Sequence, residues 1–272
     1  MNTLTIYPTF LCPFGCNFCF NKDKNLLNEF LDIEKLDKFL QKNHNKFEKI
    51  IISGGEPMNY SKIYFNLLND KIKEYNTNIQ VHCYPFQLTN YRDDVEYVFS
   101  YDFLSRPRAL EAWENMLRMT QPFDMNITLV PLMFKYHPNA IFQKLSYIKN
   151  LRNVEIKPYY KNKSTTWNIN DTVCEKFIKL WLSSKINTHF INYNKEKIRH
   201  LIGKPSKIEI KEQNNYNLLP DGKLYIDYFD ENDIHDFKEI KPSEIDIIKS
   251  NKPSCIDFYS KDLQDWAKET NV

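Results

Sequence analysis

Three cysteines lie within eight residues near the N-terminus, at Cys12, Cys16 and Cys19. Three thiols cannot all pair with one another, so a disulfide framework explains this C-x3-C-x2-C loop poorly. The short spacers let the side chains converge on one metal centre, where three thiolates hold three irons and leave a fourth open to a small molecule. The alternative is a structural zinc ion whose fourth ligand comes from elsewhere in the chain. The odd number of thiols favours iron–sulfur chemistry over zinc.

Two predicted strands must position this loop. The β-branched run Thr3–Tyr7 stops at Pro8 and would deliver the cysteines at its carboxyl end. The apolar run Lys49–Ser53 predicts a second strand, which the turn Gly54-Gly55-Glu56-Pro57 terminates. Between the strands, an acidic first turn after Asp32 and apolar residues at helical spacing predict an amphipathic helix.

The alternation of strand and helix continues to about residue 200. Strands are predicted over 78–83, 98–102, 126–130, 154–157 and 188–191, and helices over 60–75, 93–97, 107–119, 140–150 and 175–183. This order indicates a mostly parallel sheet with helices outside. The count is below the eight units of a closed barrel, so the predicted fold class is α/β, a partial (β/α)6 TIM-like barrel. Ligands of such folds bind beyond the carboxyl ends of the strands, where the cysteine loop and the Gly-Gly-Glu-Pro turn both lie.

The character of the sequence changes after Gly203. Short antiparallel strands are predicted over 207–210, 216–219 and 223–228, with a hairpin turn at Pro220-Asp221-Gly222. An acidic loop over 230–236 and a final helix over 261–269 are predicted after them. We therefore expect residues 1–203 to form the barrel core and residues 204–272 to form a small extension of β-hairpin and helix.

Composition places the chain among ordinary globular proteins, with 42% hydrophobic and 26% charged residues. A net charge of +2 carries no clear signature of nucleic-acid or membrane binding. The sequence has no apolar run that would cross a bilayer and no signal-peptide pattern at its start, so we expect a cytoplasmic protein. In a reducing compartment, Cys83, Cys174 and Cys255 are expected to be buried small residues rather than ligands.

Taken together, the cysteine loop, the aromatic Phe18 directly before its last cysteine, and the Gly54–Pro57 turn at the next strand end resemble the radical S-adenosylmethionine (radical SAM) superfamily. The resemblance implies a [4Fe–4S] cluster held by Cys12, Cys16 and Cys19, with S-adenosylmethionine (SAM) chelated to the fourth iron. It also implies reductive cleavage of SAM to a 5′-deoxyadenosyl radical, and a reductant such as flavodoxin or ferredoxin as a partner.

The same resemblance implies which residues contact SAM. Gly54 and Gly55 would let backbone groups approach its amino acid moiety, and Glu56 would accept a hydrogen bond from its ammonium. Phe18 would pack near the adenine. The bland alternatives stay open, in which the glycine turn is only a turn and Phe18 is only part of the core.

Further along, Ser100-Tyr101-Asp102 looks like the Ser-Leu-Asp motif of peptide-modifying members, where the serine helps to hold SAM. Arg106 and Arg108 just beyond it are both candidates for the SAM carboxylate, because a guanidinium suits bidentate carboxylate binding. We place Ser100 and Arg108 among the expected cofactor contacts. Lys157 and Tyr159, at a strand end, are candidate substrate contacts.

The segment 217–227 is similar to the opening hairpin of the SPASM/Twitch extensions of peptide maturases. In those proteins a cysteine that binds an auxiliary cluster follows the hairpin strand. Here Asp227 takes that place and only Cys255 lies beyond it, so the extension is expected to lack an auxiliary cluster. The resemblance covers about residues 1 to 200 well, and the remainder only as a shape.

Three functions remain open from the sequence. The first is hydrogen abstraction from a peptide or protein side chain, as the extension suggests. The second is the same radical chemistry on a small molecule or a nucleotide. The third is a non-enzymatic iron–sulfur or zinc-binding protein. A catalytic side chain beyond the cofactor contacts is not assigned.

Overall fold

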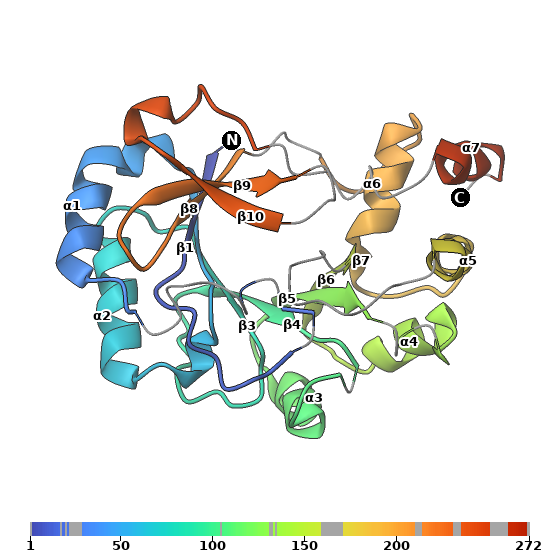
Figure 1. Cartoon of the computed structure of the whole chain (residues 1–272). Coiled ribbons are helices and arrows are strands. Elements are labelled where there is room, and N and C mark those ends of the chain that lie inside the picture. The colour runs from blue at the N-terminus through green and yellow to red at the C-terminus, as the bar shows by residue number, and fades with distance from the viewer. Residues whose placement is uncertain are drawn as a thin grey trace. The chain divides into compact units, whose positions relative to one another are not determined.

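The computed structural model (Figure 1) describes residues 2–16, 18–19, 21, 29–103, 105–130, 133, 135–158, 171–209, 214–230, 235–250 and 261–270. Its helices and strands follow in this order: β1 (Asn2–Ile6), α1 (Ile33–Asn43), β2 (Lys49–Ile52), α2 (Lys62–Lys73), β3 (Ile79–Cys83), β4 (Glu96–Ser100), α3 (Ala109–Arg118), β5 (Phe123–Leu129), α4 (Pro138–Leu145), β6 (Leu151–Pro158), α5 (Asp171–Leu182), β7 (Ile191–Asn192), α6 (Tyr193–Leu201), β8 (Asn214–Leu218), β9 (Leu224–Phe229), β10 (His235–Ile240) and α7 (Lys261–Glu269). None of the helices among these residues combines the length and the apolar character that crossing a membrane requires.

The chain divides into two compact units. The first contains β1 to β3 with α1 and α2, together with β8 to β10 from near the C-terminus. The second contains β5 to β7 and the helices α3 to α7. The boundary falls within β4, after Val98. The hairpin of the predicted extension lies in the same unit as the N-terminal strand.

The sheet of the first unit has the strand order β10-β9-β8-β1-β2-β3. β1 lies parallel to β2 with Leu4 opposite Ile50, and β2 lies parallel to β3. On its other side β1 lies parallel to β8 over five pairs, with Leu4 opposite Tyr216. β8, β9 and β10 are antiparallel to one another. β1 is thus a central strand, and Leu4 and Ile6 on it are fully buried.

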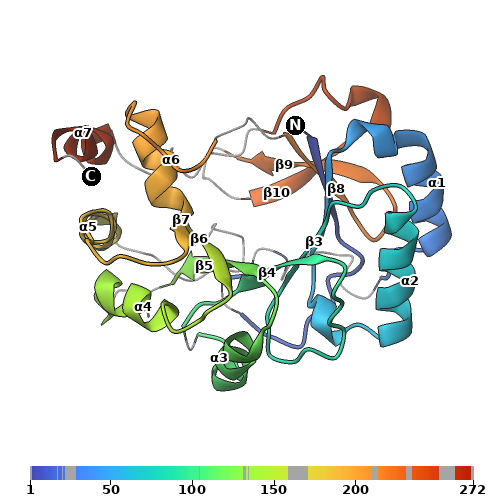
Figure 2. The ribbon, with the colours of Figure 1, turned by 180° about the vertical axis from the view of Figure 1, so that it is seen from behind.

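Helices α1 and α2 lie side by side in this unit, as both views show (Figures 1 and 2). Asp32 caps α1 by accepting hydrogen bonds from the backbone N–H groups of Glu34 and Lys35, as an acidic residue before a helix does. Leu36 and Leu40 on α1 are fully buried, so the apolar face predicted from their spacing packs into the core.

The sheet of the second unit contains parallel strands. β5 pairs with β6 from Phe123 to Leu129, and β6 pairs with the short β7. Alternate residues of β5 are buried, including Phe123, Met125 and Ile127, as expected of a strand with one face in the core. The fold class is confirmed as α/β, with mostly parallel strands alternating with helices in the manner of a partial TIM-like barrel.

Three local predictions were wrong. Residues 93–97 are not helical: they form a turn that leads into β4, and Arg92 and Lys73 both bind the carboxylate of Asp94 in it. Residues 207–209 do not form a strand. The predicted acidic loop over 230–236 was wrong at its end, because residues 235 and 236 begin a regular strand, β10, whose hydrogen bonds come from antiparallel pairing with β9. Tertiary pairing overrides weak local propensity in this last case.

Candidate functional site

The cysteine loop begins where β1 ends, and backbone hydrogen bonds hold its base on both sides. Tyr7 N donates to Leu218 O of β8 at 2.8 Å, and Ser53 N after β2 donates to Ile6 O at 2.9 Å. The loop therefore leaves a strand that is fixed between two neighbours, which limits how far its first residues can move.

The three thiols share this loop with different degrees of exposure. Cys12 is exposed, Cys16 is buried and Cys19 is half-buried, and Cys19 N donates to Cys16 O at 3.1 Å across a turn. Over the described residues, no group of three His, Cys, Asp or Glu side chains is arranged to hold a metal ion. The structure thus brings the cysteines onto one short loop without drawing their side chains into a ligand geometry. The donor set itself, three thiols from one loop, fits an iron–sulfur cluster.

The two glycines of the next turn are pressed against the cysteine loop. Gly55 N donates to Thr9 O at 2.8 Å, and Glu56 N donates to Leu11 O at 3.1 Å. A Cβ atom on Gly55 would stand 1.8 Å from Leu11 O, and one on Gly54, where φ is +112°, would stand 2.6 Å from Thr9 O. The close approach that these glycines permit is therefore to the backbone just before Cys12. Approach to SAM remains a prediction beside this structural role.

Glu56 ties the same turn to the end of β3. Its carboxylate is 3% exposed, with Oε1 accepting from Met58 N and Oε2 accepting from Tyr84 N, each at 3.0 Å. Burial, and then the charge of Glu56, raise the pKa values of the Tyr60 hydroxyl and the Cys83 thiol. A buried carboxylate fixed in this way places negative charge in the turn, and each of its oxygens is able to accept a further bond.

Aromatic rings pack against the loop from the segment after β3. The ring of Phe14 meets Tyr84 edge-on at 5.2 Å and Phe86 at 4.9 Å between centroids. Phe18 is 8% exposed, which suits either a core position or a wall for a bound adenine. Its contact with SAM stays a prediction. Sequence reasoning did not single out Phe14, although it is the other aromatic residue between Cys12 and Cys19.

Two predicted SAM contacts, Ser100 and Arg108, belong to the second unit, and a buried ion pair lies between them in the sequence. Ser100 ends β4, and Arg106 Nε donates to Asp102 Oδ2 at 2.8 Å, where the Asp102 side chain is 2% exposed. Arg108 precedes α3 and donates from Nε to Glu111 Oε2 at 2.8 Å on the surface. Arg106 therefore has a structural partner in the core. The roles of Ser100 and Arg108 toward SAM stay predictions.

Lys157, a candidate substrate contact, lies in an ion-pair group on β6. Its Nζ lies 3.3 Å from Glu155 Oε2, and Lys197 Nζ lies 2.7 Å from Glu155 Oε1. Burial raises the pKa of Glu155, but the two lysines outweigh it and lower that pKa to about 2. Tyr159 lies outside the described residues.

The scattered cysteines are only partly covered by the structure. Cys83 is 3% exposed at the end of β3, which confirms its expected place in the core. The side chain of Cys174 and the whole of Cys255 lie outside the described residues.

The hairpin of the extension packs against the base of the cysteine loop. Tyr7, Phe10 and Leu219 form a buried cluster, with Tyr225 and Phe237 packed against it. The ring of Phe237 lies 5.5 Å from Tyr7 and 6.5 Å from Phe10 between centroids. The C-terminal hairpin thus supports the segment that leads to Cys12.

A polar network lies in the same hairpin. Asp227 Oδ1 accepts from Asn217 Nδ2 at 3.2 Å and bonds His235 Nε2 at 3.0 Å, and all three residues are at most 5% exposed. Burial, then the charges of Asp227 and Cys19, raise the pKa of Tyr7. Sequence reasoning recognised Asp227 only as the replacement of a cysteine. It missed His235, because the strand that carries it was predicted as a loop.

Residues 6–108 match the family model described as the Radical SAM superfamily. No curated protein matches the chain. Among solved structures, the chain is similar to native anSMEcpe with bound AdoMet and Cp18Cys peptide, with a TM-score of 0.64 and 14% identity over 83% of this chain and 73% of that one. It is also similar to Streptococcus suis SuiB bound to S-adenosylmethionine, with a TM-score of 0.58 and 14% identity over 82% of this chain and 59% of that one. A second SuiB structure, bound to the precursor peptide SuiA, has a TM-score of 0.57 and 14% identity over 98% of this chain and 66% of that one.

Proposed function

We propose that this chain is a radical SAM enzyme that uses a [4Fe–4S] cluster and SAM to abstract hydrogen from a side chain of a peptide or protein. When bound, the cluster and SAM supply a 5′-deoxyadenosyl radical, which is strong enough to break a C–H bond. The remaining question is what this chain's own residues contribute.

In this proposal Cys12, Cys16 and Cys19 hold the cluster. The observation that carries the proposal is the close packing of the Gly54–Gly55 turn against the cysteine loop, which we call the clamp. Backbone hydrogen bonds there join two motifs that lie far apart in the sequence. A loop held at its base by β2, β8 and this turn is preorganised, so less ordering is needed when a cluster forms.

As SAM contacts, we assign Glu56 to the ammonium, Phe18 to the adenine, and Ser100 with Arg108 to the remaining polar groups. The assignment of Glu56 is supported by its buried carboxylate, which accepts hydrogen bonds from two backbone N–H groups. The assignment of Arg108 is supported by its side chain, which carries a guanidinium and is 45% exposed.

A peptide substrate is favoured by the proteins that share the fold. AnSMEcpe has been solved with the Cp18Cys peptide, and SuiB with its precursor peptide SuiA. At 14% identity this likeness establishes the fold alone, and the substrate class of our chain is part of the proposal. We further propose a cytoplasmic protein with a flavodoxin or ferredoxin as its reductant, since a low-potential electron is needed for the cleavage.

We also propose a division into a radical SAM partial-barrel core over residues 1–203 and a SPASM/Twitch-like extension over residues 204–272. The hairpin β8–β9, with its turn at Pro220-Asp221-Gly222, supports it. Within the described residues the extension contributes to the core through β8, so it would brace the cysteine loop without a metal of its own.

The enzymatic proposal is tested with anaerobically reconstituted protein given dithionite and SAM. The expected products are 5′-deoxyadenosine and methionine, separated by liquid chromatography. Cys16→Ala should lose the cluster absorption and both products, whereas Cys83→Ala, which removes a buried thiol outside the loop, should keep them. Full iron loading of the wild type without any SAM cleavage would contradict the proposal.

The substrate class is tested separately, with the translated products of short reading frames beside the gene. A peptide substrate should increase 5′-deoxyadenosine formation and should change mass only when SAM and reductant are both present. If instead a nucleoside or a small metabolite stimulates cleavage and no peptide does, the peptide proposal fails while the radical SAM chemistry stands.

A further inference from the structure

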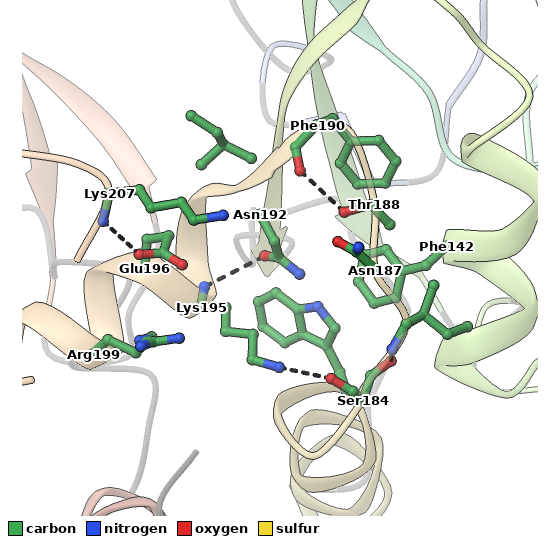
Figure 3. A pocket seen from close by; sticks show the side chains of 13 residues that line it. Phe142, Ser184, Asn187, Thr188, Phe190, Asn192, Lys195, Glu196, Arg199 and Lys207 are labelled. Carbon is green, nitrogen blue, oxygen red and sulfur yellow. Dashed lines mark hydrogen bonds between the residues drawn. The ribbon is translucent and has the colours of Figure 1, made fainter. Parts of the chain in front are cut away.

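A small cavity lies within the second unit, apart in sequence from every residue assigned above to the cluster or to SAM (Figure 3). The loop between α5 and β7 forms it together with the first two turns of α6. Its volume is about 160 Å³, room for roughly five waters at about 30 Å³ each. Pockets for drug-sized molecules measure roughly 300 Å³ or more, so this cavity suits a smaller ligand. The lining consists of Phe142, Trp181, Ser184, Ile186, Asn187, Thr188, Phe190, Ile191, Asn192, Lys195, Glu196, Arg199 and Lys207.

Three cationic side chains line this cavity, and two of them donate hydrogen bonds to backbone carbonyl oxygens. Lys195 Nζ donates to Ser184 O at 2.8 Å, as Figure 3 shows, and Arg199 Nε donates to Pro205 O at 3.1 Å. Lys207 is exposed. In the part of the chain that the structure describes, none of the three forms an ion pair with a carboxylate within 4 Å. The cavity therefore has cationic groups whose charge is not neutralised by a direct partner.

One carboxylate lines the cavity, and it is already engaged. Glu196 is 8% exposed, and its Oε2 accepts from Lys207 N at 2.7 Å (Figure 3). Burial, and next the nearby charge of Arg199, lower the pKa of Lys195. Three cations against one carboxylate leave an excess of positive charge in a partly buried place. An anion entering the cavity relieves this repulsion.

A buried donor lines the same cavity. Trp181 is 1% exposed, and its indole Nε1 makes no hydrogen bond among the described residues. Indole nitrogen is a donor only, and a buried donor without an acceptor is destabilising. A ligand with an acceptor oxygen removes that cost. Phe142 and Phe190 supply apolar walls. The ligand that fits is therefore compact, and its polar atoms are acceptor oxygens.

From this arrangement we propose that the cavity binds a compact oxyanion, a carboxylate or phosphate group, through Lys195, Arg199, Lys207 and the indole N–H of Trp181. The group comes either from a free small molecule or from an acidic side chain of a bound peptide. Both sources present the same acceptor oxygens. This inference does not depend on the proposed radical chemistry.

Binding is tested by isothermal titration calorimetry of the full-length holoprotein with three probes: inorganic phosphate, succinate, and an N-acetylated glutamate dipeptide amide beside its glutamine counterpart. At least one oxyanion probe should bind, with affinity that falls as salt is raised. The glutamine peptide should not bind. Preference for phosphate or succinate assigns a free small molecule, and preference for the glutamate peptide assigns a side chain.

Two variants and one control locate the site. Arg199→Gln and Trp181→Phe should each weaken binding roughly tenfold or more, since each removes a donor to an oxyanion. Lys149→Gln, an exposed lysine of the same unit that does not line the cavity, should bind as the wild type does. Circular dichroism checks that the variants are folded. If Trp181→Phe is not folded, Lys207→Gln, at an exposed position, is measured in its place. Equal binding by the cavity variants and the wild type would overturn the proposal, as would the absence of binding by every probe at millimolar concentration.

Discussion

Gly55→Ala is expected to separate the glycine turn from the cysteine loop. The new Cβ would stand 1.8 Å from Leu11 O, a backbone atom that no side-chain rotation can remove. Leu11 must retreat by more than about 1 Å, which stretches the bonds Gly55 N to Thr9 O and Glu56 N to Leu11 O. Two backbone hydrogen bonds at about 1 kcal/mol each, with overpacking of about 1–3 kcal/mol, predict a loss of about 3–5 kcal/mol.

The assay combines urea unfolding with iron analysis after anaerobic reconstitution. We expect a lower free energy of unfolding and a lower ratio of iron to protein, since Leu11 directly precedes Cys12. Gly15→Ala is the matched control: it lies in the same loop, and a Cβ there would meet nothing within 4 Å. That substitution should change stability by less than about 1 kcal/mol. If Gly55→Ala equals Gly15→Ala in both measurements, the clamp does not hold the cysteine loop.

Three further predictions concern charged groups. Arg106→Met leaves the 2%-exposed side chain of Asp102 without its ion-pair partner, and chemical unfolding should show a loss of about 3 kcal/mol; an unchanged midpoint would refute this role. Glu155 has a folded-state pKa lowered from 4.5 to about 2, so its contribution is present above pH 4.5 and is lost as pH falls toward 2. Glu155→Gln should therefore destabilise by about 1–3 kcal/mol at pH 7, and the gap to wild type should close in acid; a gap constant with pH would contradict the assignment. His235→Phe removes a 3.0 Å bond to the buried Asp227 carboxylate, and thermal unfolding should show a loss of about 1–3 kcal/mol, with no loss counting against the network.

Much of the fold was predictable because its signals are local. Apolar periodicity located α1 and α2, and the last helix was predicted with the bounds that the structure has, Lys261–Glu269. Both β1 and β2 were placed within a residue or two, since β-branched runs ending at Pro8 or at Gly54 leave little choice. The family match over residues 6–108 agrees with the motifs read from the cysteine spacing and the Gly-Gly-Glu-Pro turn.

The candidate site was predictable only in its residue types. The sequence assigned Gly55 to a bound ligand, but its nearest neighbour is Leu11 O, in a loop that precedes it by more than forty residues. Spacing names three cysteines without specifying their exposure, which ranges from exposed Cys12 to buried Cys16. The neighbour of Gly55 and the exposure of each cysteine depend on which part of the backbone packs against them. No local sequence pattern encodes that packing.

The sequence by itself determined the chemistry, because thiols at short spacing and a glycine turn after a strand are local facts. Tertiary structure alone decided what supports them. The sequence predicts a strand over 216–219, but such a strand would suit either edge of a sheet or a separate hairpin. Only the folded chain places β8 parallel to β1, across more than two hundred residues, and so brings Phe237 and the Asp227–His235 pair to the base of the cysteine loop. The partner of a strand is selected by the free energy of the whole core, which is a property of the assembled chain rather than of any segment.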